Sequence, residues 1–311
     1  IVGTRVNEGE VMGKHTNFRI GGPAKWFVEV KTLEELQRVL AVVSKQHLDF
    51  FVLGGGSNIL VNDQGFEGVG IKMAMRTYEI EGTRVRSDAG VLASALARAT
   101  ATRGLKGLVW AISLPGTIGG GVRGNAGCFG GEMKDYLVSV LVLRDGRLVE
   151  LSKEALVFGY RESAIKHSRD IIVSVTFELE EGNAAELKME LDDKLMKRKT
   201  SQPLDAGSAG CLFKNYEIKQ DEDVQRLREK IDIPSEMLSA RRISAGWLID
   251  NLDLKGMQIG GAKISQQHGN FVVNTGCATA EDVAQLVAFI KTRARNEYGI
   301  LLQEEVQYVG F

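Results

Sequence analysis

Two glycine-rich turns are the parts of this chain whose residue types and spacing best fit ligand chemistry. Leu114–Gly131 (LPGTIGGGVRGNAGCFGG) holds eight glycines, and a shorter run, LGGGSN, spans Leu53–Asn58. Glycine lets peptide N–H groups approach phosphate oxygens and adopt positive φ without steric cost. The needs of a packed interior do not explain this composition. We therefore predict that both turns hold one extended nucleotide cofactor from two sides.

The two turns differ in how specific they are. LGGGSN lacks the lysine and Ser/Thr of a P-loop and the spacing of a dinucleotide fingerprint, so a tight strand-to-loop turn explains it equally well. The longer run is more specific, because a purely structural loop rarely needs so many glycines.

Two side chains elsewhere could act on a bound substrate. Arg161, in the sequence YRES, offers a permanent charge and a planar fork suited to a carboxylate. The alternative is a surface arginine paired with Glu162. Cys211 lies between small residues, and an ordinary thiol is mostly protonated at neutral pH and can donate that proton. Its alternative is a small buried hydrophobic residue.

Further polar residues follow these two. Lys214 and Asn215 come after Cys211, although they could equally be a solvated lysine and a turn residue. Strand alternation would direct Glu304 and Glu305 to opposite faces, so at most one of them faces a given site; either could also be an exposed carboxylate. His268 has no second histidine at ligand spacing, so we predict no metal site.

Composition limits the class of protein. The chain has 311 residues, enough for about two or three domains, and its 44% hydrophobic and 25% charged content is that of a globular protein. A net charge of −1 argues against nucleic acid or a membrane surface as partner. No apolar run approaches the ~20 residues of a membrane span, and the first ten residues lack a signal pattern. Cys128, Cys211 and Cys277 suggest neither a disulfide framework nor a zinc site, which favours a reducing cytoplasm. Nothing in the sequence demands more than a monomer.

The helices and strands that must position these residues are expected in three blocks of the chain. In the first, we expect a strand at Trp26–Val30, a helix from Leu33 to about Lys45 opened by a Thr32–Glu35 capping box, and strands at Phe50–Leu53 and Gly70–Met73. In the second, we expect a helix at Val91–Arg103 ended by Gly104, a hairpin of Leu137–Leu143 and Leu148–Leu151 around Asp145-Gly146, and a strand at Ile171–Leu179. In the third, we expect a helix from Ala184, another capped by Thr279, and a final strand at Val306–Val309.

The motifs occur in an order that is itself informative. In chain order they are NFRIGGPA (Asn17–Ala24), VLGGGSNIL (Val52–Leu60), LPGTIGG, NAG, YRES, SAGCLFKN, AGWLIDNLDLKG (Ala245–Gly256), GGAKIS, HGNFVVN (His268–Asn274) and EEVQYVG. This ordered set resembles the MurB family of bacterial UDP-N-acetylenolpyruvoylglucosamine reductases over nearly the whole chain.

The resemblance implies a fold and a reaction. The fold would be α+β: an FAD-binding PCMH (vanillyl-alcohol-oxidase-type) fold of two subdomains, 1–77 and 78–182, followed by an α+β substrate-binding domain, 183–311, whose last strand carries a catalytic glutamate. FAD would be bound and NADPH would be the co-substrate. The substrate would be UDP-GlcNAc-enolpyruvate, reduced to UDP-N-acetylmuramate for peptidoglycan synthesis in the bacterial cytoplasm, with the hydride delivered from N5 of reduced FAD.

The resemblance also assigns residues. Arg161, Cys211 and Glu305 match the catalytic arginine, proton donor and glutamate. Positions matching substrate contacts are Tyr160, Lys214, Asn215 and His268. Positions matching cofactor contacts are Gly54, Gly55, Gly56, Ser57, Asn58, Ile59, Pro115, Gly116, Gly119, Gly120, Asn125, Ala126, Gly127 and Arg161.

Two departures and two rival functions stay open at this point. The short spacing between Tyr160 and Ile171 resembles the type II form of the family. The segment 216–243, which contains Pro234, would be either a helix over the substrate cleft or decoration. The rivals are an oxidase of the same flavin fold that uses O₂, and a non-catalytic nucleotide-binding protein. The joint presence of Arg161, Cys211 and Glu305 speaks against the second.

Overall fold

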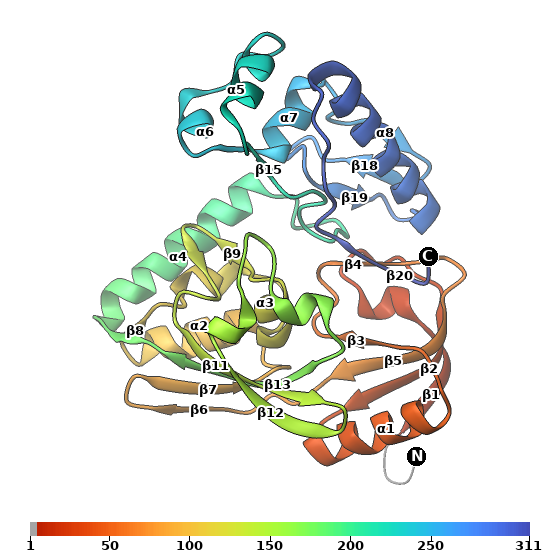
Figure 1. The fold of residues 1–311 in the computed structure, drawn as a ribbon, viewed down its shortest axis with the longest axis vertical. Coiled ribbons are helices and arrows are strands. Elements are labelled where there is room, and N and C mark those ends of the chain that lie inside the picture. Colours follow the sequence, from red (N-terminus) through yellow and green to blue (C-terminus); the bar gives the residue numbers. More distant parts are fainter. Residues whose placement is uncertain (1–4) are drawn as a thin grey trace. The chain divides into compact units, whose positions relative to one another are not determined.

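The computed structural model describes residues 5–311 and divides them into two compact units (Figure 1). The first unit contains the described residues up to Glu10 together with 24–56 and 66–200. The second contains 11–23, 57–65 and 201–311. Each unit has its own hydrophobic core. The boundaries expected at residues 77 and 182 stay a prediction.

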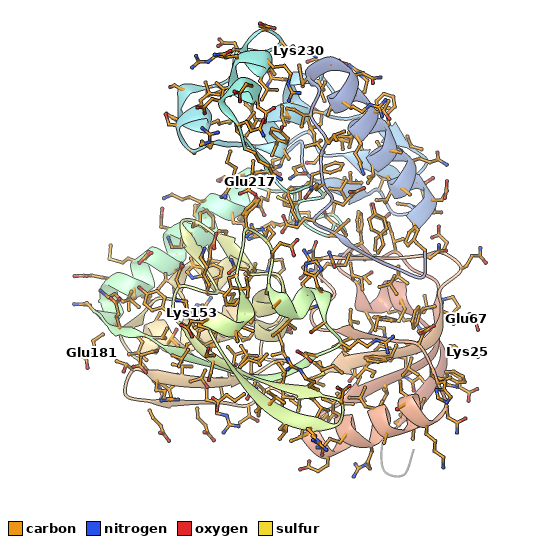
Figure 2. All side chains as sticks on the ribbon, viewed as in Figure 1. Lys25, Glu67, Lys153, Glu181, Glu217 and Lys230 are labelled. Atoms are coloured by element: carbon orange, nitrogen blue, oxygen red, sulfur yellow. The ribbon has the colours of Figure 1, made fainter. Side chains whose placement is uncertain are left out.

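A four-stranded sheet begins the first unit. Its order is β1 (Val6–Val11), β2 (Pro23–Val30), β5 (Phe66–Met73) and β3 (Phe50–Leu53), with β5 parallel to both β2 and β3. Lys25 of β2 and Glu67 of β5 form a 3.1 Å ion pair on its exposed side (Figure 2). Helix α1 (Leu33–Lys45) follows β2 and buries Leu36, Val39 and Val43. These elements confirm the strand, helix and strand predicted before the first glycine turn.

The predicted capping box of α1 is half correct. Thr32 accepts a hydrogen bond from the N–H of Glu35 (3.2 Å), as expected. The Glu35 carboxylate, however, accepts from the N–H of Lys31 (2.6 Å), one residue before the N-cap. The reciprocal bond therefore shifts by one residue, because a flexible glutamate side chain can reach either N–H group.

An antiparallel five-stranded sheet completes the first unit. Its order is β12 (Arg147–Ser152), β11 (Leu137–Arg144), β13 (Ile171–Glu178), β7 (Arg84–Asp88) and β6 (Tyr78–Glu81). The β11–β12 hairpin confirms the prediction, since Asp145 and Gly146 take the positive φ values, 48° and 77°, that a two-residue turn requires. Helices α2 (Ala93–Thr102) and α4 (Ala184–Ser201) also occur where predicted.

The glycine-rich run is predicted as a turn without a packing role, and the structure differs. Residues Ile118–Arg123 form a short helix, α3, in which Ile118 and Val122 are fully buried. A Cβ atom added at Gly119 would lie 2.7 Å from the Cβ of Ala89, and one at Gly121 would lie 2.6 Å from the Cε of Met133. Close packing therefore explains part of the glycine content, and the sequence argument that excluded packing was wrong on this point.

In the second unit, helices pack on short strands. Strand β4 (Ile59–Val61) pairs in parallel with β20 (Gln307–Val309), and β17 (Gln258–Ile259), β18 (Ala262–Ile264) and β19 (Val272–Asn274) form a small sheet. Helix α7 spans Ala245–Asn251. Helix α8 (Ala280–Tyr298) begins with the predicted Thr279 cap, reinforced by Asp282 in a capping box.

The segment 216–243 is a helical excursion closed at its base. Strands β15 (Tyr216–Glu217) and β16 (Arg242–Ile243) pair, and α5 (Asp221–Arg228) and α6 (Ser235–Ser239) lie between them. Its Leu227 and Ile233 are buried in the core of the second unit. The segment is thus part of that core rather than decoration.

Short elements connect the main ones. They are the strands β8 (Leu105–Lys106), β9 (Gly127–Cys128), β10 (Gly131–Glu132) and β14 (Glu180–Glu181), and the 3₁₀ turns Met12–His15, Val109–Ser113, Glu154–Leu156 and Ala164–His167. Among residues 5–311, no helix combines the length and the apolar character that crossing a membrane requires.

Candidate functional site

The two glycine turns meet within the first unit. A Cβ atom added at Gly55 would lie 2.6 Å from the Cα of Gly116, and one at Gly54 would collide with the hydroxyl of Thr117. Gly116 has φ +125°, which L side chains rarely adopt. Two chain segments about sixty residues apart in the sequence therefore lie in direct contact.

The two predicted cofactor contacts in α3, Gly119 and Gly120, differ in the space beside them. A Cβ atom added at Gly120 would have only the Thr117 hydroxyl within 4 Å, at 3.6 Å, so free space adjoins this residue, while its N–H donates to the Thr117 hydroxyl (3.4 Å). Gly119 has no such space, because its N–H donates to the carbonyl of Ala89 (2.9 Å) and its α-carbon packs on the same residue. Of these two residues, Gly120 leaves room for a ligand beside its α-carbon and Gly119 serves packing.

Arg161 lies beside the NAG segment. Its guanidinium donates to the carbonyl of Gly127 (2.7 Å) and, at 3.5 Å, to that of Asn125. Its backbone is in the left-handed region (φ +57°), and the ammonium group of Lys166 donates to its carbonyl (2.9 Å). The guanidinium also lies 5.4 Å from the ring centroid of Tyr160. Arg161 and Tyr160 are thus brought together with Asn125–Gly127, while Glu162 forms an ion pair with Lys166 and a 2.8 Å hydrogen bond with Nε2 of His167.

The side chain of Asn125, part of this segment, is buried and forms hydrogen bonds with its neighbours. It is fully buried, and its amide nitrogen donates to the carboxylate of Glu132 and to the carbonyl of Gly159, both at 2.9 Å. Its side-chain oxygen accepts from the N–H of Lys134 (3.2 Å). The amide is therefore engaged with protein groups. Sequence reasoning missed Glu132 and Lys166, because neither stands in a periodic or motif position.

In the second unit, Cys211 and Glu305 lie on adjacent segments. The N–H of Glu305 donates to the carbonyl of Leu212 (2.8 Å), and the N–H of Lys214 donates to the carbonyl of Gln303 (2.9 Å). Cys211 also forms, through its backbone, an isolated antiparallel β-bridge with Phe271. It is a half-buried thiol outside any disulfide.

Asn58, just before β4, is hydrogen-bonded to the segment that contains Glu305. Its amide donates to the carbonyl of Glu305 (3.1 Å), and its own carbonyl accepts from the N–H of Gln307 (3.0 Å). Glu304 instead forms a 2.8 Å ion pair with Lys291 of α8. Of the two glutamates, Glu304 is therefore paired with a lysine of α8, whereas the backbone of Glu305 is hydrogen-bonded to the segment that carries Cys211.

Two predicted substrate contacts also have structural partners. The Asn215 side-chain oxygen accepts from the N–H of Ala245 at the start of α7 (3.1 Å). His268 Nδ1 accepts from the N–H of Asn270 (3.2 Å), and its ring lies 4.8 Å from that of Phe271. Burial lowers the pKa of His268 from its ordinary value, so the imidazole is neutral at pH 7.

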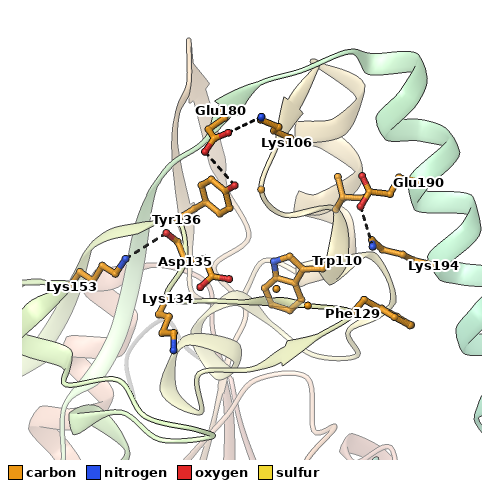
Figure 3. A pocket seen from close by; sticks show the side chains of 14 residues that line it. Lys106, Trp110, Phe129, Lys134, Asp135, Tyr136, Lys153, Glu180, Glu190 and Lys194 are labelled. Carbon is orange, nitrogen blue, oxygen red and sulfur yellow. Dashed lines mark hydrogen bonds and ion pairs between the residues drawn. The ribbon is translucent and has the colours of Figure 1, made fainter. Parts of the chain in front are cut away.

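A separate groove of about 680 Å³ lies in the first unit (Figure 3). It contains Trp110, Phe129 and Tyr136, and two of its lysines form ion pairs with glutamates that also line it: Lys106 with Glu180 (2.8 Å) and Lys194 with Glu190 (3.0 Å). None of the residues predicted for catalysis or binding lines it. Within residues 5–311, no three His, Cys, Asp or Glu side chains gather as a metal site would require.

Family models match both halves of the chain. Residues 24–152 match an FAD binding domain, and residues 202–309 match the C-terminal domain of UDP-N-acetylenolpyruvoylglucosamine reductase.

Whole-chain relatives agree with these models. A UDP-N-acetylenolpyruvoylglucosamine reductase of Clostridioides difficile is 39% identical over 97% of this chain and 92% of its own length. One from Alkaliphilus metalliredigens is 38% identical over the same shares. The crystal structure of the reductase MurB from Thermus caldophilus aligns with a TM-score of 0.78 at 35% identity, covering 98% of this chain and 99% of that one.

The contact between the glycine turns gives a first prediction. Gly55→Ala places a methyl group against the Gly116 backbone, so we expect a loss of about 1–3 kcal/mol in stability and weaker FAD binding. Thermal unfolding and quenching of flavin fluorescence measure the two effects. Gly182→Ala is the matched control, because its Cβ would meet neighbours only at 3.4 Å or more. Equal FAD affinity in Gly55→Ala and Gly182→Ala would contradict the prediction.

Proposed function

The chain belongs to the family of UDP-N-acetylenolpyruvoylglucosamine reductases, and on that premise we propose that it reduces the enolpyruvyl ether of UDP-N-acetylglucosamine to UDP-N-acetylmuramate, with FAD as cofactor and NADPH as reductant. The observation that carries this proposal is the hydrogen-bonded pairing of the Cys211 and Glu305 segments, inside the region matched by the family's C-terminal domain. The proposal includes a bacterial cytoplasmic location and a monomer.

The first unit would hold the cofactor. The turns at 54–56 and 115–120 lie in contact and leave space beside the α-carbon of Gly120. Ser57, Asn58 and Ile59 continue the first turn into the second unit. When bound, FAD supplies the hydride that adds to the β-carbon of the enolpyruvyl group, and NADPH restores it. The residues of the chain must then stabilise charge and provide one proton.

Arg161 would stabilise the negative charge. Hydride addition leaves a carbanion on the α-carbon, and that charge spreads onto the adjacent substrate carboxylate. A guanidinium fork can bind both carboxylate oxygens and remains charged at any working pH. The Gly127 carbonyl and the Lys166 ammonium hold Arg161 from either end, so little reorganisation is needed as the charge develops.

Cys211 would complete the addition. Its thiol gives a proton to the α-carbon, so one hydride and one proton together convert the C=C bond to a saturated ether, and the thiolate regains a proton from solvent. Glu305, on the neighbouring segment, would act at the same centre as the family's catalytic glutamate. Lys214, Asn215, Tyr160 and His268 would bind the sugar nucleotide, with neutral His268 presenting its Nε2–H as a donor.

The overall activity has a direct assay. We expect the FAD-loaded protein to oxidise NADPH only when the enolpyruvyl sugar nucleotide is present, and mass spectrometry to find a product heavier by two hydrogens. Peroxide formation from an alcohol or sugar, without NADPH consumption, would instead identify an O₂-dependent oxidase of the same fold.

The proton donor is tested by two substitutions at one position. Cys211→Ser keeps an O–H donor, so we expect it to retain substantial turnover. Cys211→Ala removes the donor, so we expect normal flavin reduction by NADPH but reoxidation by the enolpyruvyl substrate slowed by about 10²–10⁴-fold. Stopped-flow absorbance separates the two half-reactions. Parent-like reoxidation in Cys211→Ala would remove the thiol from the mechanism.

The arginine is tested by a substitution that keeps its charge. We expect Arg161→Lys to lose turnover by on the order of 10²-fold, because a point charge cannot reproduce the planar fork. Steady-state kinetics measure the loss, and circular dichroism checks the fold. Wild-type kcat/KM in this variant would contradict the role.

A further inference from the structure

The backbone around Cys211 is held on one side by a single residue. The backbone carbonyl of Asn270 accepts a hydrogen bond from the N–H of Leu212 (2.8 Å). Its side chain forms two hydrogen bonds with Phe213: the amide oxygen accepts from the Phe213 N–H (2.9 Å), and the amide nitrogen donates to the Phe213 carbonyl (2.8 Å). Three consecutive hydrogen bonds therefore fasten the residues that follow the thiol.

An amide is the side chain that matches this position. In a strand, the N–H and C=O of one residue point to the same side, and a neighbouring strand normally supplies one acceptor and one donor. Here the side chain of Asn270 supplies both. Asn270 is 2% exposed and Phe213 1%, so water cannot replace either bond, and an unmet one costs about 1–3 kcal/mol.

Asn270 is itself anchored. Its N–H donates to Nδ1 of His268. The next residue, Phe271, forms the backbone β-bridge with Cys211. All four polar groups of Asn270 are thus engaged, and three of them hold Leu212 and Phe213. On the other side, the N–H of Glu305 donates to the Leu212 carbonyl. A shift of Asn270 would be transmitted to the positions of Cys211 and Glu305.

We propose that Asn270 is the positioning residue of the Cys211 thiol, fixing its backbone through the paired amide bonds to Phe213. The inference rests on the proposed role of Cys211 as proton donor. Asn270 need not touch the substrate. It sets where the proton is delivered, and a misplacement of about 1 Å can cost on the order of 10²-fold in rate.

Asn270→Asp tests this with little change of shape. The carboxylate can accept from the Phe213 N–H but cannot donate, and it places an anionic oxygen against the Phe213 carbonyl. A protonated carboxyl both accepts and donates, so the native pattern returns at low pH, and burial assists by raising the pKa of such a carboxyl. Asn274→Asp is the matched control, since the Asn274 amide nitrogen also donates to a backbone carbonyl, that of Phe18 (3.1 Å), and the side-chain oxygen accepts from N–H groups outside residues 211–214.

Two readouts are expected to respond. At about pH 8, reoxidation of the flavin by the enolpyruvyl substrate slows by on the order of tenfold to hundredfold in Asn270→Asp, while reduction by NADPH is unchanged. The deficit relative to wild type shrinks reversibly, in one preparation, as the pH falls to about 6. In the FAD-free chain, the iodoacetamide labelling ratio of Cys211 to exposed Cys277 rises severalfold at the higher pH. Asn274→Asp leaves both readouts at wild-type values.

The outcomes separate this inference from the proposed function. Wild-type reoxidation and an unchanged labelling ratio in Asn270→Asp overturn the inference. Equal loss of both half-reactions with no recovery at low pH also overturns it, because that pattern marks a general structural defect. If Cys211→Ala turns over like the parent while the labelling ratio still changes, Asn270 holds the thiol but the thiol is not the proton donor, and the proposed function fails on that point.

Discussion

Hydrogen bonding on both sides of the segment Cys211–Lys214 is the constraint on which the second unit depends. Asn270 holds one side, and residues 303–305 hold the other. Asn58 then links the carbonyl of Glu305 to the start of β4. Residues far apart in the sequence therefore become neighbours through main-chain hydrogen bonds together with the side-chain amides of Asn270 and Asn58.

The first unit achieves comparable rigidity by removing side chains. Gly55 and Gly116 allow two turns to touch, and Gly119 and Gly121 allow α3 to lie against Ala89 and Met133. The glycine-rich sequence thus combines close packing at some positions with free space beside the α-carbon of Gly120. Arg161 is fastened to the same region through Gly127 and Lys166.

Local signals in the sequence predicted the elements that depend on nearby residues. The Thr279 cap, the Asp145-Gly146 turn and the apolar face of α1 each lie within a few positions of the residues they organise. Helix α3 was missed because glycines hide its periodicity, although Ile118 and Val122 stand four residues apart on one face. Asn270 was missed because its partner, Phe213, lies 57 residues away. The thiol of Cys211 marked it as a possible proton donor, but only the family resemblance separated Glu305 from Glu304, since both are the same residue type.

The most direct test of the account is an anaerobic titration of the FAD-loaded wild-type protein. NADPH should bleach the visible flavin absorption. Addition of the enolpyruvyl ether of UDP-N-acetylglucosamine should then restore it, in proportion to the UDP-N-acetylmuramate formed. A flavin that NADPH reduces but that only O₂ can reoxidise would contradict the account, as would a chain that binds no FAD.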